Sequence, residues 1–108
     1  MIYNIIAVPT FKRELKKLAK KYDSIKSDIA VLFESLEVNP EQGVALGNNC
    51  YKIRISIASK NKGKSGGARV IINIVLAENN VYLLAIYDKS EKESLSDKEL
   101  DELLKFIP

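Results

Sequence analysis

The chain has 108 residues, of which 46% are apolar, and a net charge of +3 at neutral pH. A chain of this length buries roughly two thirds of its unfolded surface, so we expect a single domain spanning residues 1–108. One cysteine cannot form an internal disulfide, and no run of about 18 apolar residues is present to span a bilayer. The apolar start of the chain lacks the basic flank and cleavage site of a secretory signal, so we expect a cytoplasmic protein.

Positive charge is concentrated in the middle of the chain. Residues 42–77 contain no Asp or Glu but six cations, which are Lys52, Arg54, Lys60, Lys62, Lys64 and Arg69. Outside this segment the carboxylates outnumber the cations. Such a local excess of one charge is typical of an anion-binding surface.

The first third of the chain predicts a strand followed by two helices. Residues 2–8 are mostly apolar and β-branched, and Pro9 ends the run. We expect Thr10 to cap the first helix and Asp23 or Ser24 to begin the second. Apolar residues recur at helical spacing in both segments: Phe11, Leu15, Leu18, Ala19 and Tyr22, then Ile25, Ile29, Leu32 and Leu36. The two helices should form a hairpin.

The middle of the chain predicts a loop and three strands. Asn39-Pro40, Gly43 and Gly47 indicate a loop through residue 49. Residues 50–57 alternate, with Lys52 and Arg54 on the face opposite the isoleucines. After a glycine-rich loop, residues 68–76 and 81–87 are apolar on both faces, as in central or covered strands.

The last residues predict a short helix that begins with a capping box at Ser96 and Glu99. The expected order is strand, helix, helix, three antiparallel strands and helix. This order defines an α+β fold in which an antiparallel sheet packs against an N-terminal helical hairpin.

The basic strand is the first candidate site. Lys52 and Arg54 should project from one face, roughly 7 Å apart. Arg69 begins the next strand and could join them if the strand register places it on the same face. Three cations on one face repel each other, and a phosphate backbone would relieve that repulsion.

The glycine-rich loop is the second candidate. Lys60, Lys62 and Lys64 are expected to bind RNA or phosphate, because nearby glycines let backbone amides approach an anion. A solvated hairpin loop kept soluble by its charge is the alternative. The loop leads into a strand rather than a helix, which excludes a nucleotide-binding P-loop.

Missing residue types also restrict the chemistry. With no histidine and one cysteine, a zinc site, a Ser-His-Asp triad and a histidine-based ribonuclease are excluded or improbable. The scattered carboxylates make a two-metal nuclease a weak candidate. We expect no metal and no cofactor, and any acid or base must be Lys, Arg, Tyr, Asp or Glu.

Several sequence blocks in order carry a family resemblance. They are FKRELKKLAKKY, NP, NNCYKIRI, GKSGGARVI and LLAIYDKSEKESLS. Together they resemble the RelE/ParE superfamily of bacterial type II toxins, nearest its RelE and HigB-like branch. The resemblance covers essentially the whole chain and implies the small RelE-like fold.

The resemblance also implies an activity and partners. RelE-like toxins are ribosome-dependent endoribonucleases that enter the A site, cut messenger RNA and form hetero-oligomers with a cognate antitoxin. The basic residues of the family fall on Lys52, Arg54 and Arg69, and its further catalytic residues lie near Tyr87 and Lys89. Lys52 is the first choice for proton abstraction, with Tyr87 or Lys89 as proton donor.

Two other functions remain open at this point. ParE members of the superfamily inhibit DNA gyrase without ribonuclease residues, and fold alone cannot separate the two activities. A chain that only binds antitoxin is the third possibility. The presence of Lys52, Arg54 and Arg69 favours the ribonuclease.

Overall fold

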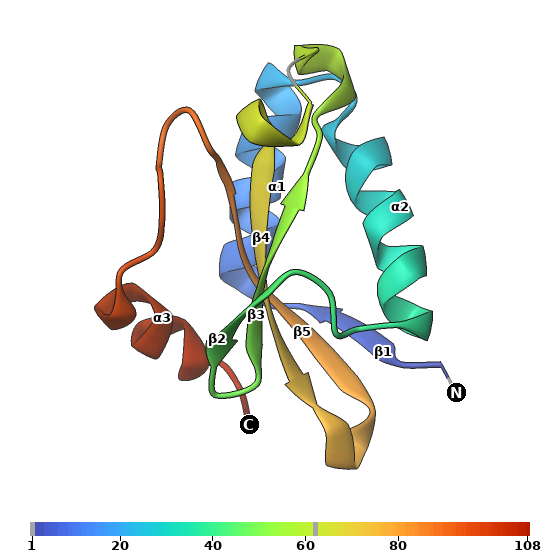
Figure 1. The fold of residues 1–108 in the computed structure, drawn as a ribbon, viewed down its shortest axis with the longest axis vertical. Coiled ribbons are helices and arrows are strands. Elements are labelled where there is room, and N and C mark those ends of the chain that lie inside the picture. The colour runs from blue at the N-terminus through green and yellow to red at the C-terminus, as the bar shows by residue number, and fades with distance from the viewer. Residues whose placement is uncertain (1, 62) are drawn as a thin grey trace.

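The computed structural model describes residues 2–61 and 63–108, which form one sheet with helices on both sides (Figure 1). In chain order the elements are β1 (Asn4–Ala7), α1 (Pro9–Lys21), α2 (Ile25–Val38), β2 (Val44–Gly47), β3 (Cys50–Ile55), β4 (Ala68–Val75), β5 (Asn80–Asp88) and α3 (Asp97–Leu104). Short 3-10 turns are η1 (Ala58–Lys60), η2 (Lys64–Gly66) and η3 (Leu76–Glu78). The predicted α+β class is confirmed. No helix in the described part of the chain is long and apolar enough for a membrane span.

The sheet has the strand order β1-β5-β4-β3-β2. β1 runs parallel to β5, and the other pairs are antiparallel. β4 and β5 occupy the centre, and nearly all of their side chains are buried. The prediction that these two apolar runs form central or covered strands is therefore confirmed.

The helical hairpin supplies one layer of the core. All four apolar residues predicted for the second helix are buried, and Phe11 and Leu18 anchor the first. The expectation that Thr10 caps the first helix is wrong, because α1 already begins at Pro9. The Thr10 hydroxyl instead donates to the Leu84 carbonyl of β5 (3.3 Å), and one helical turn later Glu14 accepts from the Ile86 N–H (3.3 Å). These side chains cover the edge of β5 beyond the end of β1.

One strand was not predicted. Residues 44–47 were expected to lie in a loop, but they form the edge strand β2, paired with β3. Asn48 and Asn49 make the two-residue turn between them, with φ of 54° and 61°. Such left-handed pairs are the preferred connection in short hairpins. All four residues of β2 are exposed, so no hydrophobic alternation marked the strand.

The C-terminal helix begins as predicted. The Ser96 side chain accepts from the Glu99 N–H, and the Glu99 carboxylate accepts from the Ser96 N–H, which completes a capping box. Figure 1 shows α3 and α2 on opposite sides of the sheet. Leu100 belongs to the hydrophobic core, so α3 covers part of the second face.

Candidate functional site

Three candidate residues form a row across the sheet. In the strand register Arg54 lies opposite Arg69, and Arg69 lies opposite Tyr87. Directly opposed residues project from the same face of a sheet. Lys52 lies two residues from Arg54 along β3 and therefore shares that face. We call these four residues the cationic face. The strand register thus meets the condition under which Arg69 joins Lys52 and Arg54 on one face.

Arg69 is the buried cation of this face. Its residue is 4% exposed, and Nη1 donates to the Ala68 carbonyl (3.1 Å). Burial lowers the pKa of Arg69, and the nearby Arg54 lowers it further. An arginine side chain nevertheless stays charged in proteins. A desolvated cation beside a second cation attracts an anion strongly, because little water screens it.

Tyr87 presents a phenol next to this cation. Burial raises the pKa of Tyr87, Arg69 lowers it, and Glu99 of α3 raises it, with a net increase. The phenol is therefore protonated at neutral pH. Its buried hydroxyl has no hydrogen-bond partner among the described residues. The phenol therefore keeps a hydrogen-bond donor that none of the described residues uses.

Lys52 and Arg54 are the accessible part of the cationic face. Lys52 is half-buried and Arg54 is exposed. Arg54 lines a groove of about 330 Å³ between α2 and β3. Both residues also line a second groove of about 290 Å³ beside the start of β2. A polyanion could reach these two side chains directly.

Lys89 lies just beyond the end of β5. Its backbone N–H donates to the Gly67 carbonyl (3.0 Å), and its amine lies 3.6 Å from the Glu93 carboxylate. The register does not include Lys89 in the row of Arg54, Arg69 and Tyr87. Its role as proton donor stays a prediction.

Of the three loop lysines, Lys60 has a described side-chain partner. The Lys60 amine is bound to Asp88 and its side chain is only 11% exposed, so the structure gives it an internal partner. Phosphate binding by Lys60 stays a prediction. Lys62 lies outside the described residues, and Lys64 is placed only by its backbone, in η2.

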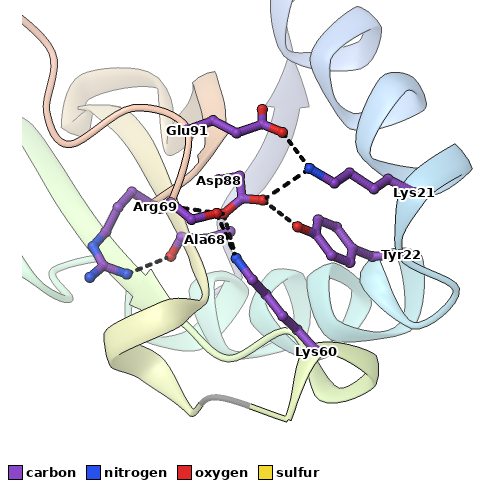
Figure 2. A network of polar contacts seen from close by, with 8 residues as sticks. Lys21, Tyr22, Lys60, Ala68, Arg69, Asp88 and Glu91 are labelled. Atoms are coloured by element: carbon purple, nitrogen blue, oxygen red, sulfur yellow. Dashed lines mark hydrogen bonds and ion pairs between the residues drawn. The ribbon is translucent and has the colours of Figure 1, made fainter.

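Asp88 is the centre of a polar cluster that was not predicted. Its carboxylate accepts from Lys60 Nζ (2.7 Å), the Tyr22 hydroxyl (2.5 Å) and the Ser90 hydroxyl (2.7 Å) and N–H (3.0 Å). Lys21 Nζ lies 4.0 Å from it and also binds Glu91. Figure 2 shows the Asp88 carboxylate and the Arg69 guanidinium pointing in different directions. We call Asp88, Lys60, Tyr22 and Ser90 the Asp88 cluster.

The electrostatics of the Asp88 cluster favour a charged pair. Burial alone would raise the pKa of Asp88, but the hydrogen bonds from Lys60, Tyr22 and Ser90 outweigh it and hold the pKa well below its usual range. Burial would likewise lower the pKa of Lys60, but Asp88 raises it above its ordinary value. A lone Asp at the end of an apolar run was the one signal in the sequence for this buried carboxylate.

Gly67 has no side chain, and this allows the start of β4 to approach the end of β3 closely. A Cβ at this position would lie 1.9 Å from the Ile55 carbonyl oxygen, which is backbone and cannot turn away. We expect Gly67→Ala to lower the free energy of unfolding, measured by urea denaturation, by about 2–3 kcal/mol. Gly63→Ala is the control, because its Cβ would meet open space and only its φ of 60° costs about 1 kcal/mol. Equal losses in the two variants would contradict the close approach.

Comparisons with known proteins agree with this fold. The family model described as "RelE toxin of RelE / RelB toxin-antitoxin system" matches residues 9–107. A mutant of the E. coli toxin RelE in the free state is 17% identical, with a TM-score of 0.63 and 100% of both chains covered. The RelBE complex of Mycobacterium tuberculosis contains a chain that is 15% identical, with a TM-score of 0.57 and coverage of 82% of this chain and 92% of that one.

A third structure belongs to the same group. In the intact E. coli RelBE toxin–antitoxin complex, the matching chain is 17% identical, with a TM-score of 0.52 and coverage of 80% of this chain and 95% of that one. At these identities the structural likeness concerns the fold, whereas the family model matches almost the whole sequence. The chain belongs to the RelE toxin family of type II RelE/RelB toxin–antitoxin systems.

Proposed function

We propose that this protein is a ribosome-dependent endoribonuclease that cuts messenger RNA and thereby inhibits translation, and that a cognate antitoxin neutralises it. Membership of the RelE family supports this activity as a class. The row formed by Arg54, Arg69 and Tyr87, with Lys52 beside it, is the observation that carries the proposal. This row combines cations for a phosphate with a phenol that can donate a proton.

The proposed reaction is a transesterification within the RNA. The ribose 2′-oxygen forms a bond to the adjacent phosphorus, and the bond from phosphorus to the 5′-oxygen breaks. The products are a 2′,3′-cyclic phosphate and a 5′-hydroxyl. Negative charge grows on the phosphate oxygens during this step, and Arg69 can stabilise it through paired N–H donors.

Two protons must move in this reaction. Lys52, or a water that it orients, takes the proton from the 2′-hydroxyl, and Arg54 stabilises the developing charge. Tyr87 donates a proton to the leaving 5′-oxygen, with Lys89 as the alternative donor. Tyr87 suits this role because its raised pKa keeps the phenol protonated at neutral pH.

The proposed partner is an antitoxin protein. Solved homologues include RelE chains in complex with the antitoxin RelB or with a peptide of it. We infer that this chain likewise forms a hetero-oligomer with a cognate antitoxin, and that its substrate complex is the ribosomal A site with bound message.

The proposed function is tested by primer extension on a defined message in a reconstituted bacterial translation reaction. In-frame cuts should appear with the purified protein and disappear when ribosomes are omitted. Cuts without ribosomes would contradict the ribosome dependence. Intact message in every lane would contradict the ribonuclease, and a DNA gyrase supercoiling assay would then test the ParE-like alternative.

Tyr87→Phe separates catalysis from stability. Because the hydroxyl has no partner among the described residues, its removal should change the free energy of unfolding by less than about 0.5 kcal/mol. Loss of the proton donor should slow single-turnover cleavage about a hundredfold. Thermal unfolding and quenched cleavage reactions on programmed ribosomes measure the two effects. A cleavage rate equal to that of the wild type would transfer the donor role to Lys89.

A further inference from the structure

The Asp88 cluster joins three segments that are distant in sequence. Tyr22 is the residue that follows α1, Lys60 comes from the connection between β3 and β4, and Ser90 follows β5. All three side chains donate to one carboxylate that is fully buried (0% side-chain exposure). Lys60 Nζ also lies 5.3 Å from the centroid of the Tyr22 ring. The cluster therefore fixes the relative positions of these segments.

The same cluster lies immediately behind the cationic face. Asp88 follows Tyr87 in β5, and in the register it lies opposite Ala68, the neighbour of Arg69. Consecutive strand residues project from opposite faces. The Asp88 side chain therefore lies on the face opposite Tyr87, which is the face that α1 covers. Its backbone carbonyl accepts hydrogen bonds from the N–H groups of Glu91 and Lys92. These bonds form the turn with which the segment after β5 begins. Movement of Asp88 would therefore shift Arg69 and Tyr87 through the backbone.

We propose that Asp88 is a positioning residue for RNA cleavage: it fixes η1, which precedes β4, and the segment after β5 so that Arg69 and Tyr87 stay aligned. This inference rests on the proposed function, since it concerns the same face. It assigns Lys60 to the protein interior as the partner of Asp88, in place of a contact with RNA phosphate. Small displacements of reacting groups cost up to about a hundredfold in rate, so loss of alignment is measurable.

Two variants weaken the Asp88 cluster by changing the residues that donate to Asp88. Asp88 itself is left unchanged, because its replacement carries the risk that the protein does not fold. Tyr22→Phe removes one hydrogen bond without any change of charge. Lys60→Met removes the ion pair, and Lys60→Arg keeps the charge as the conservative variant. Matched controls are Tyr3→Phe, a half-buried tyrosine outside the cluster, and Lys105→Met, a surface lysine paired with Glu102 at 3.0 Å.

The measurement is single-turnover cleavage on programmed ribosomes over a range of toxin concentrations. We expect Tyr22→Phe and Lys60→Met to lower the maximal rate about tenfold, with the half-saturating concentration within about twofold of the wild-type value. Lys60→Arg should recover most of the rate, and both controls should match the wild type. A direct RNA contact by Lys60 would instead raise the half-saturating concentration and leave Tyr22→Phe unaffected. An unchanged maximal rate in both cluster variants overturns the proposal.

Hydrogen exchange separates this inference from the proposed function. The N–H groups of Lys89 and Ser90 are bonded to Gly67 and Asp88, so they report on the alignment directly. They should exchange faster in Tyr22→Phe and Lys60→Met than in the two controls. If the wild type cleaves no message, the proposed function fails, and exchange alone decides whether Asp88 positions these segments. Equal exchange in all variants would then overturn the positioning role.

Discussion

Arg69→Ala is expected to slow cleavage of message on programmed ribosomes by about a hundred- to a thousandfold. Arg69 is the most buried cation of the cationic face, and it lies between Arg54 and Tyr87 in the register. Its guanidinium would bind the phosphate where charge develops, so its loss removes stabilisation that belongs to the transition state. The effect should therefore appear in the maximal rate rather than in ribosome binding.

Two further variants make this test specific. Arg69→Lys keeps the charge but loses the paired donors, so its rate should lie between those of Arg69→Ala and the wild type. Arg13→Ala removes an exposed arginine of α1 and should cleave like the wild type. Antitoxin binding and thermal unfolding show whether Arg69→Ala is folded. Cleavage by the folded variant at more than about a tenth of the wild-type rate would exclude Arg69 as the main phosphate ligand.

Asp88→Asn is expected to lower the free energy of unfolding by about 2–3 kcal/mol at neutral pH. The buried carboxylate accepts hydrogen bonds from Lys60, Tyr22 and both the hydroxyl and the N–H of Ser90, and it forms an ion pair with Lys60. An amide cannot neutralise that amine, and its NH₂ group cannot accept the bonds that the second carboxylate oxygen accepts. The free energy is measured by urea denaturation, with Asp101→Asn on the exposed face of α3 as the matched control.

The loss of unfolding free energy in Asp88→Asn should become smaller as the pH falls. The folded pKa of Asp88 lies below its unfolded value of about 3.8. The carboxylate therefore stabilises the protein fully above that value, and the stabilisation is lost as pH falls through the lower, folded pKa. The difference between the wild type and Asp88→Asn should be constant from neutral pH to about pH 5 and should narrow towards about pH 3. A difference that grows on acidification would contradict the charged state of Asp88.

Most of the cationic face could be predicted because its geometry is local. Alternation along one strand is sufficient to place Lys52 and Arg54 on the same face, whatever the strand pairs with. Arg69 needed one additional condition, the register of β3 with β4, and the structure meets it. Tyr87 was predicted from the family resemblance alone, and its place in the row became visible only when β5 was paired with β4.

Two features escaped prediction for different physical reasons. β2 is an exposed edge strand, so burial imposes no alternation on its side chains, and only the Asn48-Asn49 turn indicated a hairpin. The Asp88 cluster depends on side chains 66 and 28 positions away along the chain. A periodic pattern in the sequence gives no information on contacts between residues so far apart.

The sequence by itself determined the α+β order, the two amphipathic helices and the excess of positive charge on the middle strands, because each depends on residues within a few positions of one another. The tertiary structure decided which strands are neighbours, including the parallel pairing of β1 with β5. It also decided whether a cation faces solvent or a partner. Lys60 shows the difference, because its charge is evident in the sequence, whereas its carboxylate partner is brought to it only by the folding of β5 against the β3–β4 connection.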